Sequence, residues 1–155
     1  MGVTRFTTKR IKMFVSIFSP AFLICVLMWY MRPVPIFDLL PVTAEGKNIE
    51  HVGLAIDMGD RMGIQNCPIN AEEAQKLIEL FSTVELSYRG RYKWIEYVDG
   101  FPIITVIISN ASRSDLNITR DGKMYFDEKR YEIVGDGTEV YEYLLHMSGK
   151  EKEMA

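Results

Sequence analysis

The feature that most constrains this chain is a run of 19 residues, from Met13 to Met31, that contains no charged side chain. As an α-helix with a rise of about 1.5 Å per residue, the run would span roughly 28 Å, close to the bilayer's hydrocarbon thickness of about 30 Å. Pro20 does not exclude such a helix, because membrane helices tolerate proline. The run therefore predicts a transmembrane helix that contacts the lipid bilayer through residues 13–31.

Charged residues are distributed unevenly on the two sides of this run. The cations before it are Arg5, Lys9, Arg10 and Lys12. Arg32 follows it directly, and the chain after Arg32 carries 13 basic and all 21 acidic residues, a formal net charge of −8. By the positive-inside rule, residues 1–12 form a cytoplasmic basic arm and the acidic body lies outside the cytoplasm. The acidic body also argues against nucleic acid as a partner.

A cleaved signal peptide, a lipoprotein signal and a buried core helix are the alternatives for this run. A cleaved signal has an apolar region of about 7–15 residues that ends in small residues, and residues 28–32 contain no small residue. Ile24 stands before Cys25, where a lipoprotein signal needs a small residue. A core helix of a small domain has a polar face, which this run almost lacks. An uncleaved signal anchor fits best, and cleavage stays open.

The chain after the anchor divides into a stem, a body and a tail. Residues 32–46 contain three prolines, which favour extended backbone, so we expect a semi-rigid stem that merges into the body. Residues 47–150 are long enough to form one hydrophobic core, and we expect them to fold as an extracytoplasmic domain. The charged residues 151–155 are expected to form a disordered tail.

Two helices are predicted in the body. The first begins after Asn70, a good N-cap, and Glu73 three residues later completes a capping box. Its apolar stripe is Ala74, Leu77, Ile78 and Phe81. The second is capped by Gly137–Thr138 and ends at Gly149. Its stripe is Val140, Leu144 and Met147.

Alternating and β-branched patterns predict strands between and around these helices. The predicted ranges are 49–57, 61–66, 84–98 with an interruption near Gly90, 101–109, 116–120, 123–127 and 131–134. Residues 101–109 are apolar on both faces and should form a central strand. Hairpins are expected at Asp99–Gly100 and Asp121–Gly122. The order predicts an α+β fold, an antiparallel sheet with two helices packed on one face.

Three segments of the body resemble a family of uncharacterised extracytoplasmic domains of Gram-positive bacteria, which follow a lipoprotein signal or a signal anchor. They are residues 69–78 (INAEEAQKLI), 116–125 (LNITRDGKMY) and 131–133 (YEI). The similarity covers about residues 45–147 and consists of fold patterns without a catalytic motif. It implies placement on a bacterial surface and an α+β fold. It implies no activity, because the family has none established.

No catalytic, cofactor or metal site is predicted. His51 and His146 lack partners at the spacing of a zinc site, and a packed or exposed histidine is the better interpretation. Cys25 lies in the anchor and Cys67 in the body, so the two should not pair, and Cys67 is expected to be buried. Carboxylate pairs fall at a helix start and in a turn, where they have structural roles. The sequence contains no phosphate-binding loop or dinucleotide fingerprint.

The most suggestive segment alternates aromatic and basic side chains. Its residues are Tyr88, Arg89, Arg91, Tyr92, Lys93 and Trp94. A regular strand would place the cations on one face and the rings on the other, unless Gly90 bulges the chain. Such a strip could bind an anionic envelope polymer, lipid headgroups or an acidic protein. The sequence favours a plainer interpretation, a solvated hairpin whose rings pack on the core.

These observations together predict a membrane-anchored extracytoplasmic module that binds or interacts and is not an enzyme. Two alternatives stay open. One is an envelope enzyme whose carboxylates are assembled only by the fold, and the other is a structural subunit of a membrane complex.

Overall fold

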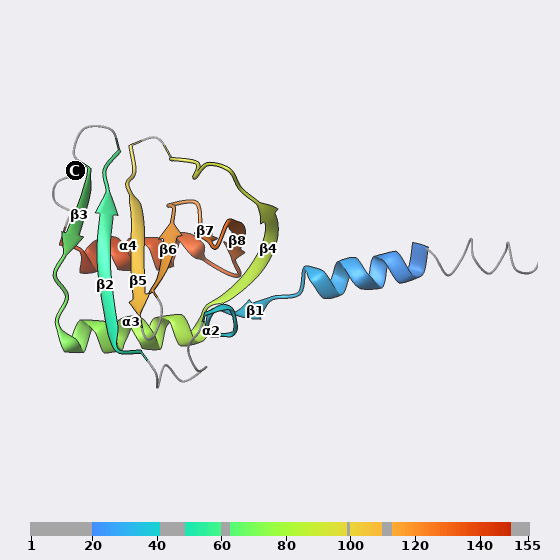
Figure 1. The fold of residues 1–155 in the computed structure, drawn as a ribbon, viewed down its shortest axis with the longest axis horizontal. Coiled ribbons are helices and arrows are strands. Elements are labelled where there is room, and N and C mark those ends of the chain that lie inside the picture. Colours follow the sequence, from blue (N-terminus) through green and yellow to red (C-terminus); the bar gives the residue numbers. More distant parts are fainter. Residues whose placement is uncertain (1–19, 41–48, 60–62, 99, 110–112, 150–155) are drawn as a thin grey trace, which may run out of the picture. The chain divides into compact units, whose positions relative to one another are not determined.

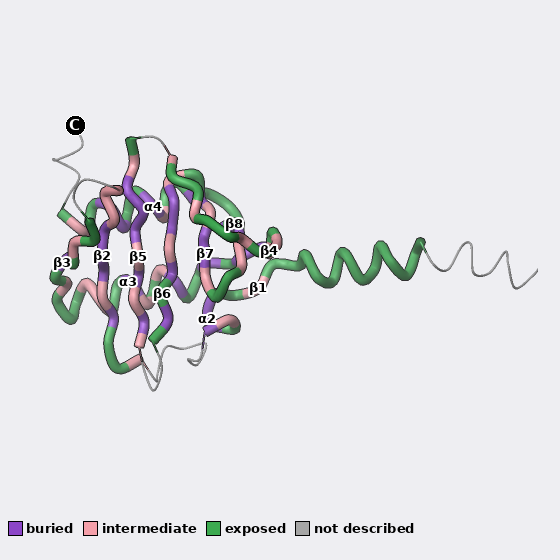
Figure 2. Tube along the Cα trace, turned by 45° about the horizontal axis from the view of Figure 1, so that its top comes forward, coloured by how far each residue is buried: buried purple, intermediate pink, exposed green. Residues whose placement is uncertain are grey.

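A computed structural model describes residues 20–40, 49–59, 63–98, 100–109 and 113–149. The chain forms two compact units, Met1–Arg32 and Pro33–Ala155. In the first unit, residues 20–30 are helical and exposed along their length (Figure 2). Within the described ranges, no helix has both the length and the apolar character needed to cross a membrane. Residues 13–19 of the proposed anchor, the basic arm 1–12 and the tail 151–155 lie outside the described ranges.

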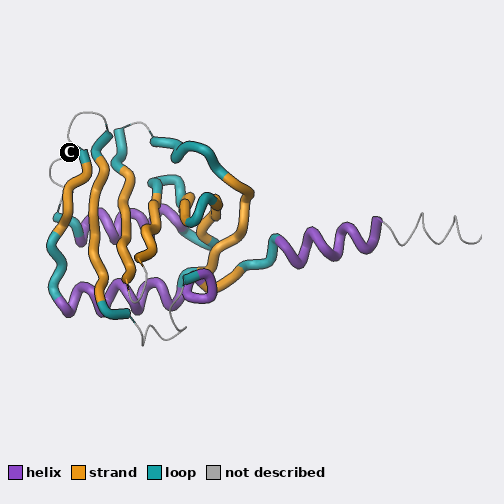
Figure 3. Tube along the Cα trace, in the orientation of Figure 1, coloured by secondary structure: helices purple, strands orange, loops and turns teal. Residues whose placement is uncertain are grey.

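An eight-stranded antiparallel sheet forms most of the second unit (Figure 1). Its strands are β1 (Val34–Pro35), β2 (His51–Asp57), β3 (Ile64–Cys67), β4 (Glu85–Arg91), β5 (Ile103–Ser109), β6 (Arg113–Ile118), β7 (Lys123–Phe126) and β8 (Lys129–Ile133). Their order across the sheet is β1-β4-β8-β7-β6-β5-β2-β3. The sheet curls, and β4 lies far from β2 and β3 (Figure 3). The predicted α+β class and antiparallel sheet are confirmed.

The first predicted helix is α3 (Ala71–Thr83), and its start agrees with the sequence pattern. The Asn70 side chain accepts a hydrogen bond from the Glu73 backbone amide at 2.9 Å, and the Glu73 carboxylate accepts one from the Asn70 amide at 2.7 Å. This capping box satisfies two amides that a helix start leaves without partners. Leu77 and Phe81 of its stripe are buried.

The second predicted helix is α4 (Gly137–Met147), with a cap and stripe that differ from the prediction. Asp136 is the N-cap, and its carboxylate accepts from the Glu139 amide at 3.1 Å. The buried side chains are Tyr141, Leu144 and Leu145 rather than Val140 and Met147. The carboxylate is a strong acceptor for the first-turn amides, which explains the cap. Val140 and Met147 are partly buried against the same core, at the margin of the buried face.

One core joins both helices to the strands. The prediction that residues 101–109 form a central strand is confirmed, because β5 pairs with β2 along seven positions and with β6 along six. Alternate side chains of β2 and β5 share a single cluster with the buried residues of α3 and α4. Its members in these elements include Val52, Leu54, Ile56, Ile104, Val106, Ile108, Leu77, Phe81, Tyr141, Leu144 and Leu145. We call the sheet surface that carries these side chains the core face, and the opposite surface the outer face.

The hairpin expected around Asp99–Gly100 is wrong. One edge of β5 pairs with β2 and the other with β6, so β5 has no free edge to which β4 could pair. Strand β4 pairs with β1 and β8 instead. Residues 92–98 and 100–102, between the distant strands β4 and β5, are irregular (Figure 1). The hairpin at Asp121–Gly122 is confirmed between β6 and β7.

Part of the expected stem belongs to the domain. Val34 and Pro35 form β1 against β4, and residues Ile36–Leu39 form the short helix α2. Ile36 and Phe37 are only 1% and 3% exposed and belong to the core. Apolar side chains after the prolines, which the sequence reading assigned to an extended spacer, are therefore held by burial. Residues 41–46 of the stem lie outside the described ranges.

Candidate functional site

A β-bulge at Gly90 divides the aromatic and basic strip into two parts. Pairing between β4 and β8 shifts register between Tyr88 and Gly90, and Gly90 has a φ of 110°, which favours glycine. Before the bulge, the Tyr88 ring contacts the Tyr131 ring of the core at a centroid distance of 5.6 Å. Arg89 forms an ion pair with Glu132 at 2.6 Å. These first two residues of the strip therefore have structural partners on β8.

After the bulge, the strip lies over the outer face of the sheet. The Tyr92 ring packs edge-on against Tyr125 at a centroid distance of 4.9 Å. Tyr125 follows Met124 of the core on β7, so its side chain points to the other face, and yet it is fully buried. The Tyr92 amide also donates to the Glu128 carbonyl at 3.2 Å. The bulge thus moves the Tyr92 ring from the core face, where a regular strand would place it together with Tyr88, to the outer face.

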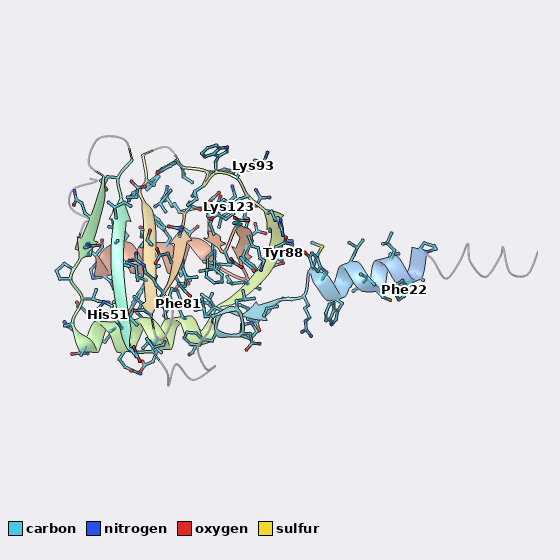
Figure 4. The ribbon with its side chains drawn as sticks, in the orientation of Figure 1. Phe22, His51, Phe81, Tyr88, Lys93 and Lys123 are labelled. Carbon is cyan, nitrogen blue, oxygen red and sulfur yellow. The ribbon has the colours of Figure 1, made fainter. Side chains whose placement is uncertain are left out.

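Arg91 and Lys93 differ from the other cations of the domain. In the described ranges after Arg32, every other lysine or arginine forms an ion pair with a carboxylate. Arg91 and Lys93 are exposed and have no such partner there. The two stand on either side of Tyr92, and Lys93 projects from the edge of the domain in Figure 4. They create a local positive surface on an acidic body.

The Trp94 side chain is 84% exposed, the largest exposed fraction among the large apolar side chains of the described ranges. A tryptophan ring in water loses the favourable free energy of burying its apolar area, which makes it a common anchor in binding surfaces. It follows Lys93 directly, and both residues line a cavity of about 340 Å³. We refer to Arg91, Lys93 and Trp94 as the basic surface.

A cavity of about 340 Å³ lies at the basic surface. It is lined by Arg91, Tyr92, Lys93, Trp94, Glu96, Tyr125 and Arg130. Its size lies at the lower end of the range for small-molecule sites. The lining combines three cations, three aromatic rings and one carboxylate, which suits an anionic group attached to a compact organic body.

Glu96 is the carboxylate of this cavity and bridges two cations. Its oxygens lie 2.8 Å from Lys123 Nζ and 3.7 Å from the Arg130 guanidinium. The hydrogen bond and the charge of Lys123, with a smaller contribution from Arg130, lower the pKa of Glu96. Lys123 also contacts Asp121 at 2.8 Å, and its hydrogen bonds to Asp121 and Glu96 raise the pKa of the Lys123 ammonium.

The Tyr125 hydroxyl is buried and has no hydrogen-bond partner of regular geometry among the described residues. Burial raises the pKa of Tyr125, although the nearby Glu96 backbone acts in the opposite direction. A buried hydroxyl without a partner destabilises a fold by about 1–3 kcal/mol, so such groups are rare and call for an explanation. This hydroxyl belongs to a residue that lines the cavity.

The other residues considered in the sequence do not assemble into a site. No group of three or more His, Cys, Asp or Glu side chains that could hold a metal ion exists in the described ranges. Cys67 is buried, as predicted.

A larger cavity of about 550 Å³ lies beside His51 and Cys67 on β2 and β3. The one cation with a permanent charge in its lining, Arg113, is bound by both carboxylate oxygens of Asp115, at 2.7 and 3.1 Å. Because that charge is already neutralised, the cavity offers less to a charged ligand than the one at the basic surface.

Sequence reasoning identified Arg91, Tyr92, Lys93 and Trp94 but missed Glu96, Tyr125 and Arg130. The last two lie on neighbouring strands as a directly opposed pair, Tyr125 with Arg130. Their alternation in the hairpin after Asp121–Gly122 could have placed them on the outer face. Nothing in the sequence shows that residues 92–96 cover that face.

Comparison with known protein families, curated proteins and solved structures finds no match to this chain. The resemblance to extracytoplasmic domains of Gram-positive bacteria therefore stays a prediction.

Proposed function

We propose that this chain is an extracytoplasmic binding module, tethered by residues 13–31, that holds an anionic polymer of the cell envelope through its basic surface. The observation that carries the proposal is that two cations, Arg91 and Lys93, form no ion pair with any described carboxylate and lie beside the exposed ring of Trp94. The other cations of the described ranges after Arg32 all have carboxylate partners. Keeping two neighbouring cations free is useful if an anion from outside binds them.

The charge distribution supports the tether. The cations before residue 13 and the acidic body after Arg32 favour a cytoplasmic N-terminus and an outer body. A polymer fits this placement, since it can reach a domain held near the membrane and contact two cations and a ring at once. The strongly acidic remainder of the body would repel a polyanion elsewhere, which confines binding to the basic surface.

Binding is tested by replacing Arg91 and Lys93 together with Gln in the full chain and measuring co-sedimentation with isolated cell envelopes. We expect roughly a 30- to 700-fold loss of affinity, because the two charged hydrogen bonds contribute about 1–2 kcal/mol each. The matched control is Lys76→Gln with Arg113→Gln, which removes the same charge from cations that already have carboxylate partners. Equal affinity of the two double variants would refute the basic surface as the site.

Placement is tested separately by protease treatment of intact and lysed cells. We expect cleavage of the body in intact cells with the wall removed and protection of an N-terminal fragment. Full protection of the body until lysis would overturn the proposed orientation.

A further inference from the structure

The Glu96 carboxylate occupies the position in which an anionic ligand group would bind the cavity. It is the one carboxylate in the lining, and it faces Arg130, a cation of the same cavity. It lies in the irregular segment after β4, and its side chain is 58% exposed. A rotation of this side chain toward solvent can therefore release Arg130 without disturbing a strand.

The two cations held by Glu96 differ in what remains when it leaves. Lys123 keeps a second carboxylate, Asp121, at 2.8 Å. Arg130 has no ion pair other than Glu96 in the described ranges. Displacement of Glu96 thus leaves Lys123 neutralised and adds Arg130 to the unpaired cations Arg91 and Lys93.

The contact between Glu96 and Arg130 is the weaker of the two. Its shortest distance is 3.7 Å, against 2.8 Å for Lys123, and its side chains are 58% and 35% exposed. Such surface pairs contribute little to stability because water screens them. A ligand that brings several oxygens to three cations at once can compete with one loosely held carboxylate.

The buried hydroxyl of Tyr125 provides a second, independent indication of a ligand. Among the described residues it has no partner of regular geometry, although the Glu96 backbone lies near enough to oppose the rise in its pKa that burial causes. When the segment around Glu96 shifts, this hydroxyl gains access to the cavity and can donate to a ligand oxygen. The Tyr125 hydroxyl is thus a donor without a regular partner among the described residues, next to Glu96, whose carboxylate occupies Arg130.

We infer that Glu96 is a built-in competitor for a phosphate group carried by a sugar or polyol. The phosphate oxygens replace the Glu96 carboxylate at Arg130 and reach Arg91 and Lys93. The exposed ring of Trp94 covers the apolar face of the sugar or polyol. A phosphate fits three cations and a phenol better than a carboxylate, because it presents more oxygens in several directions. The inference rests on the proposed function and names the group that the basic surface recognises.

Calorimetric titration of the full chain in nonionic detergent with soluble poly(glycerol phosphate) tests this inference. Glu96→Gln keeps the size of the side chain and removes the competing charge. We expect it to raise affinity roughly five- to tenfold. The control is Glu132→Gln, which removes the same charge from the partner of Arg89 outside the cavity lining. We expect the control to change affinity less than twofold.

Arg130→Gln completes a double-mutant cycle. In the wild-type background its effect should be smaller than in the Glu96→Gln background, because the contact that Arg130 gains with the phosphate is offset there by the contact that it gives up with Glu96. In the Glu96→Gln background it should abolish the gain. Equal affinities of Glu96→Gln and Glu132→Gln, or a gain that survives Arg130→Gln, would overturn the role of Glu96. That result leaves the proposed function intact if Arg91→Gln with Lys93→Gln still abolishes binding.

Two further arms separate the sources of the phosphate. Inorganic phosphate should bind more weakly than the polymer, because it offers nothing to Trp94. Vesicles that contain phosphatidylglycerol present the same glycerol phosphate chemistry on a lipid surface, and vesicles without this lipid are the control. Binding to those vesicles without binding to the polymer would refute the polymer as partner, and loss of all binding in every arm would refute both proposals.

Discussion

Two tyrosines of this domain should respond in opposite ways to loss of the hydroxyl group. Tyr125 and Tyr141 are both fully buried. The Tyr141 hydroxyl donates to the Pro102 carbonyl at 2.8 Å, whereas that of Tyr125 has no regular partner among the described residues. Tyr→Phe removes the same atom at each site. The comparison therefore isolates the contribution of the hydrogen-bond partner to stability, because both side chains are equally buried.

Tyr141→Phe should destabilise the domain. It removes a buried hydrogen bond that contributes about 1 kcal/mol and leaves the Pro102 carbonyl without that donor, which adds about 1–2 kcal/mol. Tyr125→Phe should leave the free energy of unfolding unchanged or raise it by about 1 kcal/mol, since it removes a desolvated polar atom that had no compensation. The two variants should thus differ by roughly 2–4 kcal/mol.

Urea unfolding followed by far-ultraviolet circular dichroism measures this difference. Tryptophan fluorescence is unsuitable, because Trp94 is already exposed in the folded state. In thermal unfolding the same gap corresponds to roughly 6–16 °C for a domain of this size. If Tyr125→Phe destabilises as much as Tyr141→Phe, the Tyr125 hydroxyl has a partner after all. The ligand argument would then lose its second observation.

Three further predictions concern the framework. A Cβ at Gly137 would lie 2.5 Å from the Gly122 Cα, so Gly137→Ala should lower the free energy of unfolding by about 1–3 kcal/mol in urea titrations. The comparison variant is Gly135→Ala, whose Cβ would meet no atom within 4 Å, so that any loss there comes from the positive φ of Gly135 and not from a steric clash. Asn70→Ala removes the cap of α3 and should lower the free energy of unfolding by about 1 kcal/mol in the same urea titrations. An unchanged free energy of unfolding would contradict a stabilising role of the cap. Glu96 should titrate below its ordinary pKa of 4.5 in carboxyl-detected NMR. The stabilisation from its ion pairs is therefore present at neutral pH and is lost as the pH falls through the lowered pKa. Lys123→Gln should return the pKa of Glu96 toward 4.5, and an unchanged pKa would contradict the assigned cause.

Local patterns predicted most elements of this fold because their causes are local. The capping box of α3 depends on two residues three positions apart, and the central position of β5 follows from apolar side chains on both of its faces. The turn at Asp121–Gly122 likewise depends on its own residues, with Gly122 at a φ of 75°. Each of these features could be predicted without knowing which strands pair.

The errors come from competition between distant segments. An Asp-Gly pair between two strand-like runs normally favours a hairpin, but β5 pairs with β2 and β6 over longer stretches than β4 could offer after its bulge. The stem was misjudged for a similar reason. Three prolines predict extended backbone, and they do not reveal that Ile36 and Phe37 find room in the core. Tertiary pairing decided both cases.

The candidate site shows the same division between local and distant causes, with a consequence for function. Arg91, Lys93 and Trp94 could be found from their alternation, but the sequence could not show that they differ from Arg89, which belongs to the same pattern. The bulge at Gly90 reverses the alternation of side chains after it: Arg89 before the bulge keeps its ion pair with Glu132, and the Tyr92 ring after the bulge packs against Tyr125 on the outer face. A glycine with positive φ therefore separates cations that hold the fold together from cations that are free to bind. Removing that bulge, for example by Gly90→Val, should weaken binding, because a strand without the bulge would return the Tyr92 ring to the core face and displace the segment that carries the basic surface.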